Sequence, residues 1–99
     1  MEQAYKLFFG TLTSEIRLKI INSLRKSPKT VSELQEITKL EQSIVSHNLK
    51  RLKKCGFVEV KKNGQYRVYH LNKETIEPIM KTIDNHMHKH CIKIIKGEK

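Results

Sequence analysis

The sequence predicts an α+β fold that is mainly helical and carries one two-stranded β-hairpin. Apolar residues recur at helical spacing on both sides of a short turn within residues 32–55, which predicts two helices in close succession. Strand-like alternation then runs from Phe57 to Leu71 and is split by Asn63-Gly64, a strong hairpin signal. An amphipathic segment lies at each end of the chain. This order of elements predicts a winged helix-turn-helix.

Length and charge indicate one small basic domain. The 99 residues suffice for one modest core, so we expect residues 1–99 to form a single domain with dimerisation helices at both ends. Twenty Lys and Arg oppose ten Asp and Glu, and the net charge of +10 favours a polyanionic partner. The sequence has neither the ~18-residue apolar run of a membrane span nor a signal-peptide pattern. With two cysteines and no disulfide framework, a cytoplasmic protein that does not bind membranes is expected.

The first two predicted helices supply apolar surface. Residues 2–12 form an amphipathic helix whose apolar face is unusually aromatic. Thr13 or Ser14 can cap the next helix, which carries a wide apolar stripe until Pro28 ends it. This second helix is therefore predicted to lie in the core. The apolar face of the first helix consists of Ala4, Tyr5, Phe8, Phe9 and Leu12.

The helix-turn-helix comes next in the chain. Ser32 and Gln35 have the spacing of a capping box, which would open a short first helix. After a brief turn, the second helix, residues 42–55, carries a narrow apolar stripe that suits a core. Gly56 stands just past its end, where a left-handed closing residue is expected.

The other face of residues 42–55 has the composition of a DNA-reading surface. Hydroxyl and imidazole groups there can hydrogen-bond to base edges, and the Lys and Arg side chains can neutralise phosphates. No acidic residue lies within this helix. The alternative is a solvated basic face without a partner. We predict that the helix enters the major groove of double-stranded DNA, rather than binding RNA, through Gln42, Ser43, Ser46, His47, Lys50, Arg51 and Lys54.

The hairpin is predicted to add a second DNA contact. A two-residue turn at Asn63 and Gly64 would pair Lys62 with Gln65 and group basic side chains around the tip. A surface hairpin without a function would look similar, but this one directly follows a basic helix. We expect this wing, residues 57–71, to contact the flanking backbone or the minor groove. Its DNA-binding residues would be Lys61, Lys62 and Arg67.

The last predicted helix has a seam that requires a partner. Asn72 can cap a turn, and Pro78 fits the first turn of the next helix. Its seam residues then alternate spacings of four and three, as in a coiled coil. The seam either packs inside one subunit or, as we expect, joins the first helix and the same two helices of a second subunit in a homodimer. The seam consists of Ile76, Met80, Ile83, Met87, His90 and Ile94.

Metal-ligand side chains cluster near the end of this helix. Asp84, His88 and Cys91 would lie along one flank of the seam, and His86 and His90 along the other. Either set is able to hold Zn²⁺ or Ni²⁺ with a symmetry mate. The alternative is that these are interface or solvated residues, and the neighbouring lysines repel a cation. We expect no cofactor and no metal, with Zn or Ni at these five positions as the open alternative.

Three segments carry a resemblance to a known family. They are TLTSEIRLKIINSL, VSELQEITKLEQSIVSHNLKRLKKCGFVEV and the wing NGQYRVYHL. Together they resemble the ArsR-type (ArsR/SmtB-like) winged-helix regulators as far as Leu71. The shared pattern joins Leu12 and Arg17, a V-S-H-x-L reading helix, and Gly64 and Tyr69 in the wing. The resemblance implies a homodimeric, sequence-specific transcriptional regulator that binds an operator, usually as a repressor.

The sequence departs from that family at several positions. The helix segment VSELQEI lacks the cysteine pair with which many members sense metal, which excludes a thiolate site there. Asp84 and His86 match only the first half of a last-helix metal motif of the family. Lys39 stands where the family often has a turn glycine, and Glu41 where it often has a capping serine. These two exchanges are expected to loosen the turn.

Two other functions compete with this interpretation. Cys55 with His47 or His70 suggests a thiol enzyme, but no third group orients them, and the sequence lacks H-E-x-x-H, G-x-S-x-G and a Gly-rich phosphate loop. We therefore expect that the protein is not an enzyme. A MarR- or BlaI-like winged-helix regulator that responds to a small apolar ligand is the second alternative. It is kept open by Tyr5, Phe8 and Phe9, which face a Met-rich last helix in the expected dimer.

Overall fold

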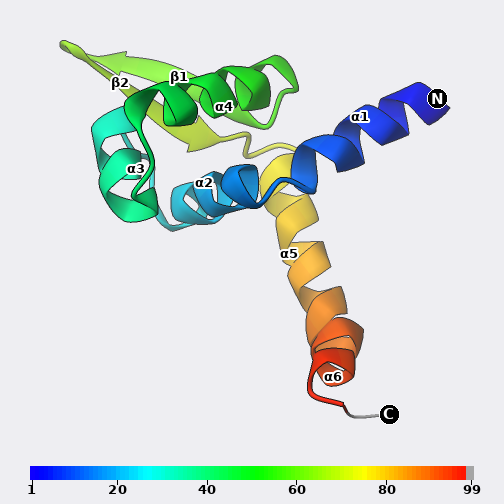
Figure 1. Ribbon diagram of the computed structural model, residues 1–99. Helices are drawn as coiled ribbons and strands as arrows, with labels where there is room; N and C mark the ends of the chain where they lie inside the picture. The colour runs from blue at the N-terminus through cyan, green and yellow to red at the C-terminus, as the bar shows by residue number, and fades with distance from the viewer. Residues whose placement is uncertain (98–99) are drawn as a thin grey trace.

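The computed structural model describes residues 1–97 and has the predicted order of helices and strands (Figure 1). It confirms the winged helix-turn-helix: a helical body, two of its helices forming the helix-turn-helix, and an antiparallel β1–β2 hairpin. None of the helices in this part of the chain is long and apolar enough to cross a bilayer. The elements are α1 (Glu2–Leu12), α2 (Glu15–Lys26), α3 (Val31–Thr38), α4 (Gln42–Lys54), β1 (Val58–Asn63), β2 (Tyr66–Leu71), α5 (Ile76–His86), a π-helical turn (Met87–Cys91) and α6 (Ile92–Ile95).

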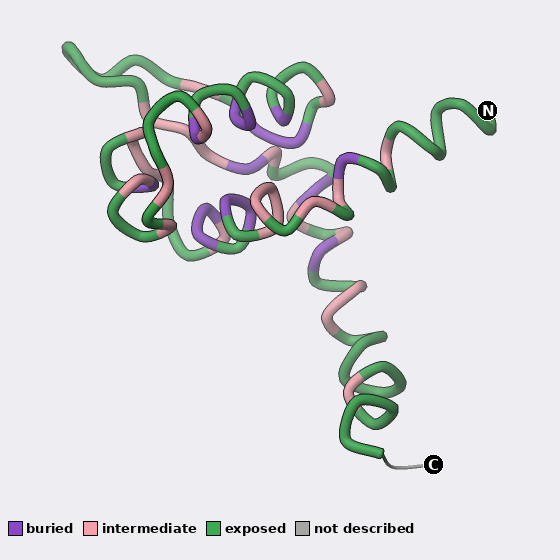
Figure 2. Tube along the Cα trace, viewed as in Figure 1, coloured by how far each residue is buried: buried purple, intermediate pink, exposed green. Residues whose placement is uncertain are grey.

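The hydrophobic core lies where α2, α3, α4 and the base of the hairpin meet. Figure 2 shows buried positions gathered there, whereas most of α1 and the end of the last helix are exposed. The apolar stripe predicted for α4 is confirmed, because each of its side chains is at most 1% exposed. This burial fixes which face of α4 remains for a partner. The most deeply buried apolar residues are Ile20, Ile21, Leu34, Val45, Leu49, Leu52, Phe57 and Val58.

Two capping residues set the starts of α2 and α3. The Ser14 hydroxyl accepts a hydrogen bond from the backbone N–H of Arg17 at 3.2 Å, as predicted. The capping box of α3, however, joins Thr30 and Glu33, not Ser32 and Gln35, so that prediction was wrong. Both pairs satisfy the sequence rule. The difference arises because Lys29 forms a β-bridge with Tyr69, and Thr30, the next residue, is then in place to cap the helix.

The register of the hairpin also differs from the prediction. Asn63 pairs with Tyr66, so the two turn residues are Gly64 and Gln65 rather than Asn63 and Gly64. Only Gly64 among them has a positive φ, +64°, as in a type II′ turn. The predicted pairing of Lys62 with Gln65 was therefore wrong.

Burial at the base of the hairpin explains this register. Val58 pairs with Leu71, and both side chains are buried in the core. The predicted turn would instead place Val58 opposite Tyr69, a shift of two residues that keeps each side chain on its face but separates Val58 from Leu71 along the sheet. Tyr69 adds a further restraint, since its backbone exchanges two hydrogen bonds with Lys29, 2.8 and 3.0 Å long. The core therefore outweighs the turn dipeptide in setting the register.

The last helix starts as predicted. The Asn72 side-chain oxygen accepts hydrogen bonds from the backbone N–H groups of Glu74 and Thr75 at 2.9 and 3.2 Å. Pro78 lies in the first turn of α5, where its missing N–H costs nothing. The prediction for this segment is confirmed.

The seam of the last helix is interrupted. Ile76 and Met80 are buried, but Met87 is 38% exposed and Ile94 is 73% exposed. The π-helical turn at Met87–Cys91 accommodates one more residue than an α-helical turn and rotates the residues of α6 relative to those of α5. The predicted continuous spacing of four and three is therefore wrong beyond Met87. Figure 1 shows α5 and α6 leaving the body, so the apolar side chains at their far end have no cover within one subunit.

Candidate nucleic-acid interface

The second helix of the helix-turn-helix, α4, presents a polar face to solvent. Its apolar stripe packs into the core, which directs the opposite face outward. Every residue that the sequence predicted to read DNA from this helix is exposed. The helix ends at Lys54, one residue before the predicted end, and Cys55 caps it. The exposed face carries Gln42, Ser43, Ser46, His47, Lys50, Arg51 and Lys54.

The turn between α3 and α4 sets the direction of α4. Lys39 closes α3 in a left-handed conformation, φ 60° and ψ 29°, and its N–H donates to the Gln35 carbonyl at 2.8 Å. Among residues 1–97, Lys39 is the only residue other than glycine that has a positive φ. Glu41 then caps α4 without a side-chain hydrogen bond to the helix. Gly56 closes α4 at φ +78°, as predicted.

The wing presents basic side chains on both of its faces. Lys62 on β1 lies directly opposite Arg67 on β2, next to the pair that closes the turn. Lys61 pairs with Val68, and alternation places it on the other face. All three basic side chains are exposed. The predicted group of Lys61, Lys62 and Arg67 is therefore divided between the two faces of one hairpin tip.

Among residues 1–97, these cations form no ion pair with a carboxylate. The part of the chain that the structure describes has one ion pair with a nitrogen–oxygen distance within 4.0 Å, between Arg25 on α2 and Asp84 on α5. The basic residues of α4 and of the wing thus lack a neutralising carboxylate at that distance. An uncompensated basic surface attracts a polyanion and releases its counterions on binding.

Sequence reasoning missed a polar contact behind the exposed face of α4. Asn48 lies on the buried side of α4 and is 7% exposed. Its Oδ1 accepts a hydrogen bond from Nη1 of Arg17 on α2 at 3.4 Å. The clue in the sequence was an amide residue among the positions of the apolar stripe. That clue predicts a buried polar contact without identifying the partner, which is 31 residues away.

Metal-ligand side chains of the last helix do not form a complete site. Asp84 accepts hydrogen bonds from both Nη atoms of Arg25, and this contact lowers the pKa of the Asp84 carboxyl. His86 and His90 lie with ring centroids 4.7 Å apart, while His88 and Cys91 are exposed. Within residues 1–97, no three His, Cys, Asp or Glu side chains come together to hold a metal ion. Neither predicted ligand set is therefore assembled in one subunit.

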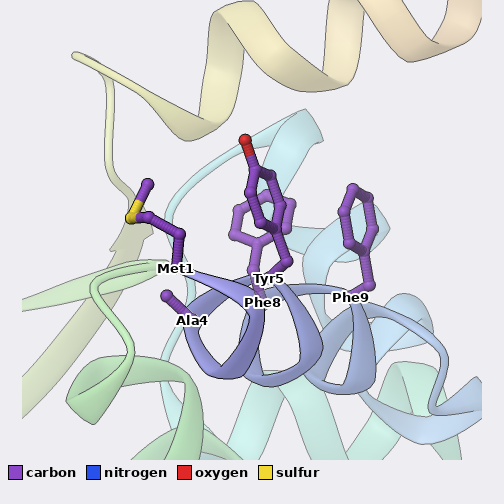
Figure 3. Close-up of a pocket in the computed structure, with 5 residues that line it drawn as sticks. All are labelled: Met1, Ala4, Tyr5, Phe8 and Phe9. Atoms are coloured by element: carbon purple, nitrogen blue, oxygen red, sulfur yellow. The ribbon is translucent and has the colours of Figure 1, made fainter.

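An aromatic ridge follows the exposed side of α1. Figure 3 shows Tyr5, Phe8 and Phe9 rising from the same side of the helix, with Met1 and Ala4 at its start. Tyr5 stacks on Phe9 at a centroid distance of 6.4 Å, and these residues are 58% and 54% exposed. Phe8 instead reaches Phe57 of the core at 5.3 Å. The five residues line an open hollow of about 370 Å³.

A helix-turn-helix followed directly by a hairpin wing defines the winged helix-turn-helix class of folds. The sequence profile described as "Bacterial regulatory protein, arsR family" matches residues 14–60, from the cap of α2 into β1. Over this stretch the chain is similar to regulators of the ArsR type, as its motifs implied. The matched family consists of regulatory proteins, which agrees with the expectation that the chain is not an enzyme.

Two relatives and one solved structure illustrate the similarity. The HTH-type transcriptional regulator NmtR of Mycobacterium tuberculosis is 40% identical over 60 residues, which are 61% of this chain and 50% of NmtR. The chain thus spans half the length of that relative. An uncharacterized HTH-type transcriptional regulator of Methanocaldococcus jannaschii is 29% identical over 85 residues, covering 84% of this chain and 93% of the relative. A homodimeric winged helix-turn-helix DNA-binding domain from Mycobacterium bovis has the same fold, with a TM-score of 0.80 at 22% identity over 89% of this chain and 82% of that one.

Proposed function

We propose that the chain is a single domain that binds operator DNA as a homodimer and represses transcription. The observation that carries this proposal is the division of α4 into a core stripe and an exposed, uncompensated basic face. A helix held in this way can lie in the major groove while the wing reaches the neighbouring backbone or minor groove. The packing of α4 on β1 supports the proposal, because it joins the exposed helix directly to the wing.

The proposed roles of the residues follow from their chemistry. On α4, the Gln, Ser and His side chains are suited to hydrogen bonds with base edges, and the Lys and Arg side chains to phosphates. On the wing, the three cations are suited to the phosphates that flank the site. The proposed DNA contacts are Gln42, Ser43, Ser46, His47, Lys50, Arg51, Lys54, Lys61, Lys62 and Arg67.

The proposed dimer joins α1 and the last helix of each subunit. Tyr5 and Phe9 expose more than half of their surface, and Ile94 and Ile95 expose 73% and 83%. Exposed apolar surface of this extent on two neighbouring projections favours a partner. The relative from Mycobacterium bovis is homodimeric, which supports the same assembly here. A two-fold axis would place two copies of α4 about one turn of DNA apart.

We propose that this function requires no metal and is exercised in the cytoplasm. The ion pair of Asp84 with Arg25 supports the first point, because it occupies one of the carboxylates that a Zn or Ni site would need. Sensing of a small apolar molecule is the second candidate function. It is favoured by the open apolar hollow on α1 between Met1 and Phe9. Its test is release of a bound duplex by apolar compounds in wild type but not in Ala4→Trp, which fills the hollow.

Selection of duplexes from a randomised pool tests the proposed function. Purified protein is expected to enrich one inverted-repeat sequence, whose affinity exceeds that of a scrambled duplex by at least about 10³-fold. Both affinities should fall steeply with salt concentration, since several phosphates are neutralised. Protein from which metal ions have been removed with a chelator should give the same enrichment. Failure to enrich any duplex would refute sequence-specific DNA binding.

A further inference from the structure

One guanidinium connects the end of α1 with the reading helix. Nε of Arg17 donates to the Thr11 carbonyl at 2.8 Å, and Nη2 donates to the Gly10 carbonyl at 3.3 Å. Nη1 donates to Oδ1 of Asn48 in the middle of α4 at 3.4 Å. The two carbonyls belong to the last turn of α1, where no backbone N–H of the helix is available to them, and the Gly10 carbonyl also accepts from the Thr13 hydroxyl at 3.0 Å. Arg17 thus uses its planar fork to satisfy α1 and to hold α4 at the same time.

The side chain of Asn48 is fixed by its second hydrogen bond. Its Nδ2 donates to the Ile44 carbonyl at 2.8 Å, which directs Oδ1 toward Arg17. At 7% exposure, the amide has little access to water that might replace either contact. Asn48 directly follows His47, a proposed reading residue, along the helix. The contact with Arg17 thus holds α4 at a position next to its exposed polar face.

A second contact joins the same turn of α1 to the end of α4. Thr11 is fully buried, and its hydroxyl donates to the Leu7 carbonyl at 2.7 Å. The hydroxyl oxygen lies 3.6 Å from Sγ of Cys55, the residue that caps α4, so the thiol is the group left to donate. The last turn of α1 is thus linked to α4 at its middle and at its end. Two separated points of attachment define the angle of a rigid rod.

We propose that Arg17 is a positioning residue: it transmits the placement of α1 to α4 and so sets the angle at which the reading helix meets DNA. The inference rests on the proposed function, in which α1 carries dimer contacts and α4 reads the operator. The two reading helices of a dimer must match the spacing of two half-sites. A change of their angle should therefore lower affinity for the operator much more than affinity for unrelated DNA.

The test compares variants of the joint between α1 and α4, that is, of the contact between Arg17 and Asn48, on two DNA probes. The variants are Arg17→Lys, Arg17→Met, Asn48→Leu and the double variant Arg17→Lys/Asn48→Leu. Lysine keeps the charge but, as a point donor, does not reproduce a three-way fork. Lys19→Met, an exposed position on the same helix, controls for the lost charge. The probes are the duplex selected by wild type and a scrambled duplex of equal composition, because the ratio of their affinities cancels any unfolded fraction.

Each variant of the joint is expected to lower the selected-to-scrambled ratio about tenfold, with Lys19→Met within twofold of wild type. The ratio should fall no further in the double variant than in Arg17→Lys alone, because both substitutions break the same hydrogen bond between Arg17 and Asn48. An unchanged ratio in both Arg17 variants, or losses that simply add, would overturn the proposal. Residual dipolar couplings supply a readout without DNA: α4 should reorient relative to α1 in Arg17→Met. An unchanged angle between α1 and α4 would refute the role of Arg17, whether or not wild type selects a duplex. Failure of wild type to select a duplex would refute only the proposed function.

Discussion

Lys62 and Arg67 face each other across the hairpin, one on each strand, at the pair next to the one that closes the turn. Two like charges directly opposite each other destabilise a hairpin. No carboxylate lies within 4.0 Å of either side chain among residues 1–97. The repulsion is relieved when an anion binds between or beside the two cations. The proposed contact of the wing with phosphates would supply such an anion.

Replacing Lys62 with Thr should separate these two effects. The free energy of unfolding should rise by a few tenths of a kcal/mol, because the repulsion with Arg67 disappears and threonine favours strands. Duplex affinity should fall, and the slope of log affinity against log salt should decrease by about one unit. Lys19→Thr on α2 is the matched control for charge. Urea titration and fluorescence anisotropy measure the two quantities, and an unchanged slope would show that Lys62 does not touch phosphate.

The turn itself can be tested at Gly64. Because its φ is +64° while Gln65 has no positive φ, Gly64→Val should strain the backbone by about 1–2 kcal/mol and Gln65→Val should not. The strain comes from the backbone alone, since a Cβ at Gly64 would meet no atom within 4 Å. Helical circular dichroism should stay close to that of wild type, and DNA binding should become weaker and less salt-sensitive. Equal effects of the two valines would contradict the observed register.

Lys39 offers a stabilising substitution. A lysine in the left-handed region carries a cost of about 1 kcal/mol that glycine avoids. Lys39→Gly should raise the melting temperature by a few degrees, given that 1 kcal/mol corresponds to about 4–8 °C in a domain of this size. Lys39→Ala controls for loss of the charge, and its melting temperature should not rise. Calorimetry on the three proteins decides the matter; a lower melting temperature for glycine would show that strain at this residue is negligible.

The ion pair of Arg25 and Asp84 predicts a specific pH dependence. The hydrogen bonds from Arg25 lower the pKa of Asp84 in the folded protein below its ordinary value near 3.9. The unfolded chain then binds the proton more tightly, so this stabilisation is present above that ordinary value and is lost as the pH falls through the folded value. Asp84→Asn should therefore show a smaller loss of stability between pH 6 and pH 3 than wild type. Urea midpoints measure it, with Glu2→Gln as the control; equal losses would exclude the pair as the cause.

The proposed dimer can be tested on α1 without damage to the core. Phe9 is 54% exposed in one subunit, so Phe9→Lys should leave each subunit folded. In a dimer that covers this ridge, the new charge would be buried at a cost of several kcal/mol. Sedimentation should therefore show monomers with near-native circular dichroism, and operator affinity should fall sharply. Lys6→Ala, an exposed change on the same helix, should remain dimeric. A Phe9→Lys protein with an unchanged dimer mass would place the interface elsewhere.

Local patterns determined most of the fold. The spacing of Val45, Leu49 and Leu52 predicted both the buried face of α4 and, by exclusion, its exposed face. Gly56 and Pro78 predicted the end of one helix and the start of another, because their backbone preferences act within a few residues. The resemblance to ArsR-type regulators was likewise carried by short motifs. These features depend on neighbours in sequence, and sequence shows them directly.

Other features were decided only when distant segments packed together. The register of the hairpin follows the burial of Val58 opposite Leu71, which overrides the Asn-Gly signal. The start of α3 depends on a bridge to β2, and the seam of the last helix is broken by a π-helical turn that its spacing did not reveal. The contact between Arg17 and Asn48 joins residues 31 positions apart. By itself, the sequence determined which helices the protein has and which face of α4 is exposed; the tertiary structure decided how these elements are aligned, because alignment depends on burial and hydrogen bonds between segments that no local pattern encodes.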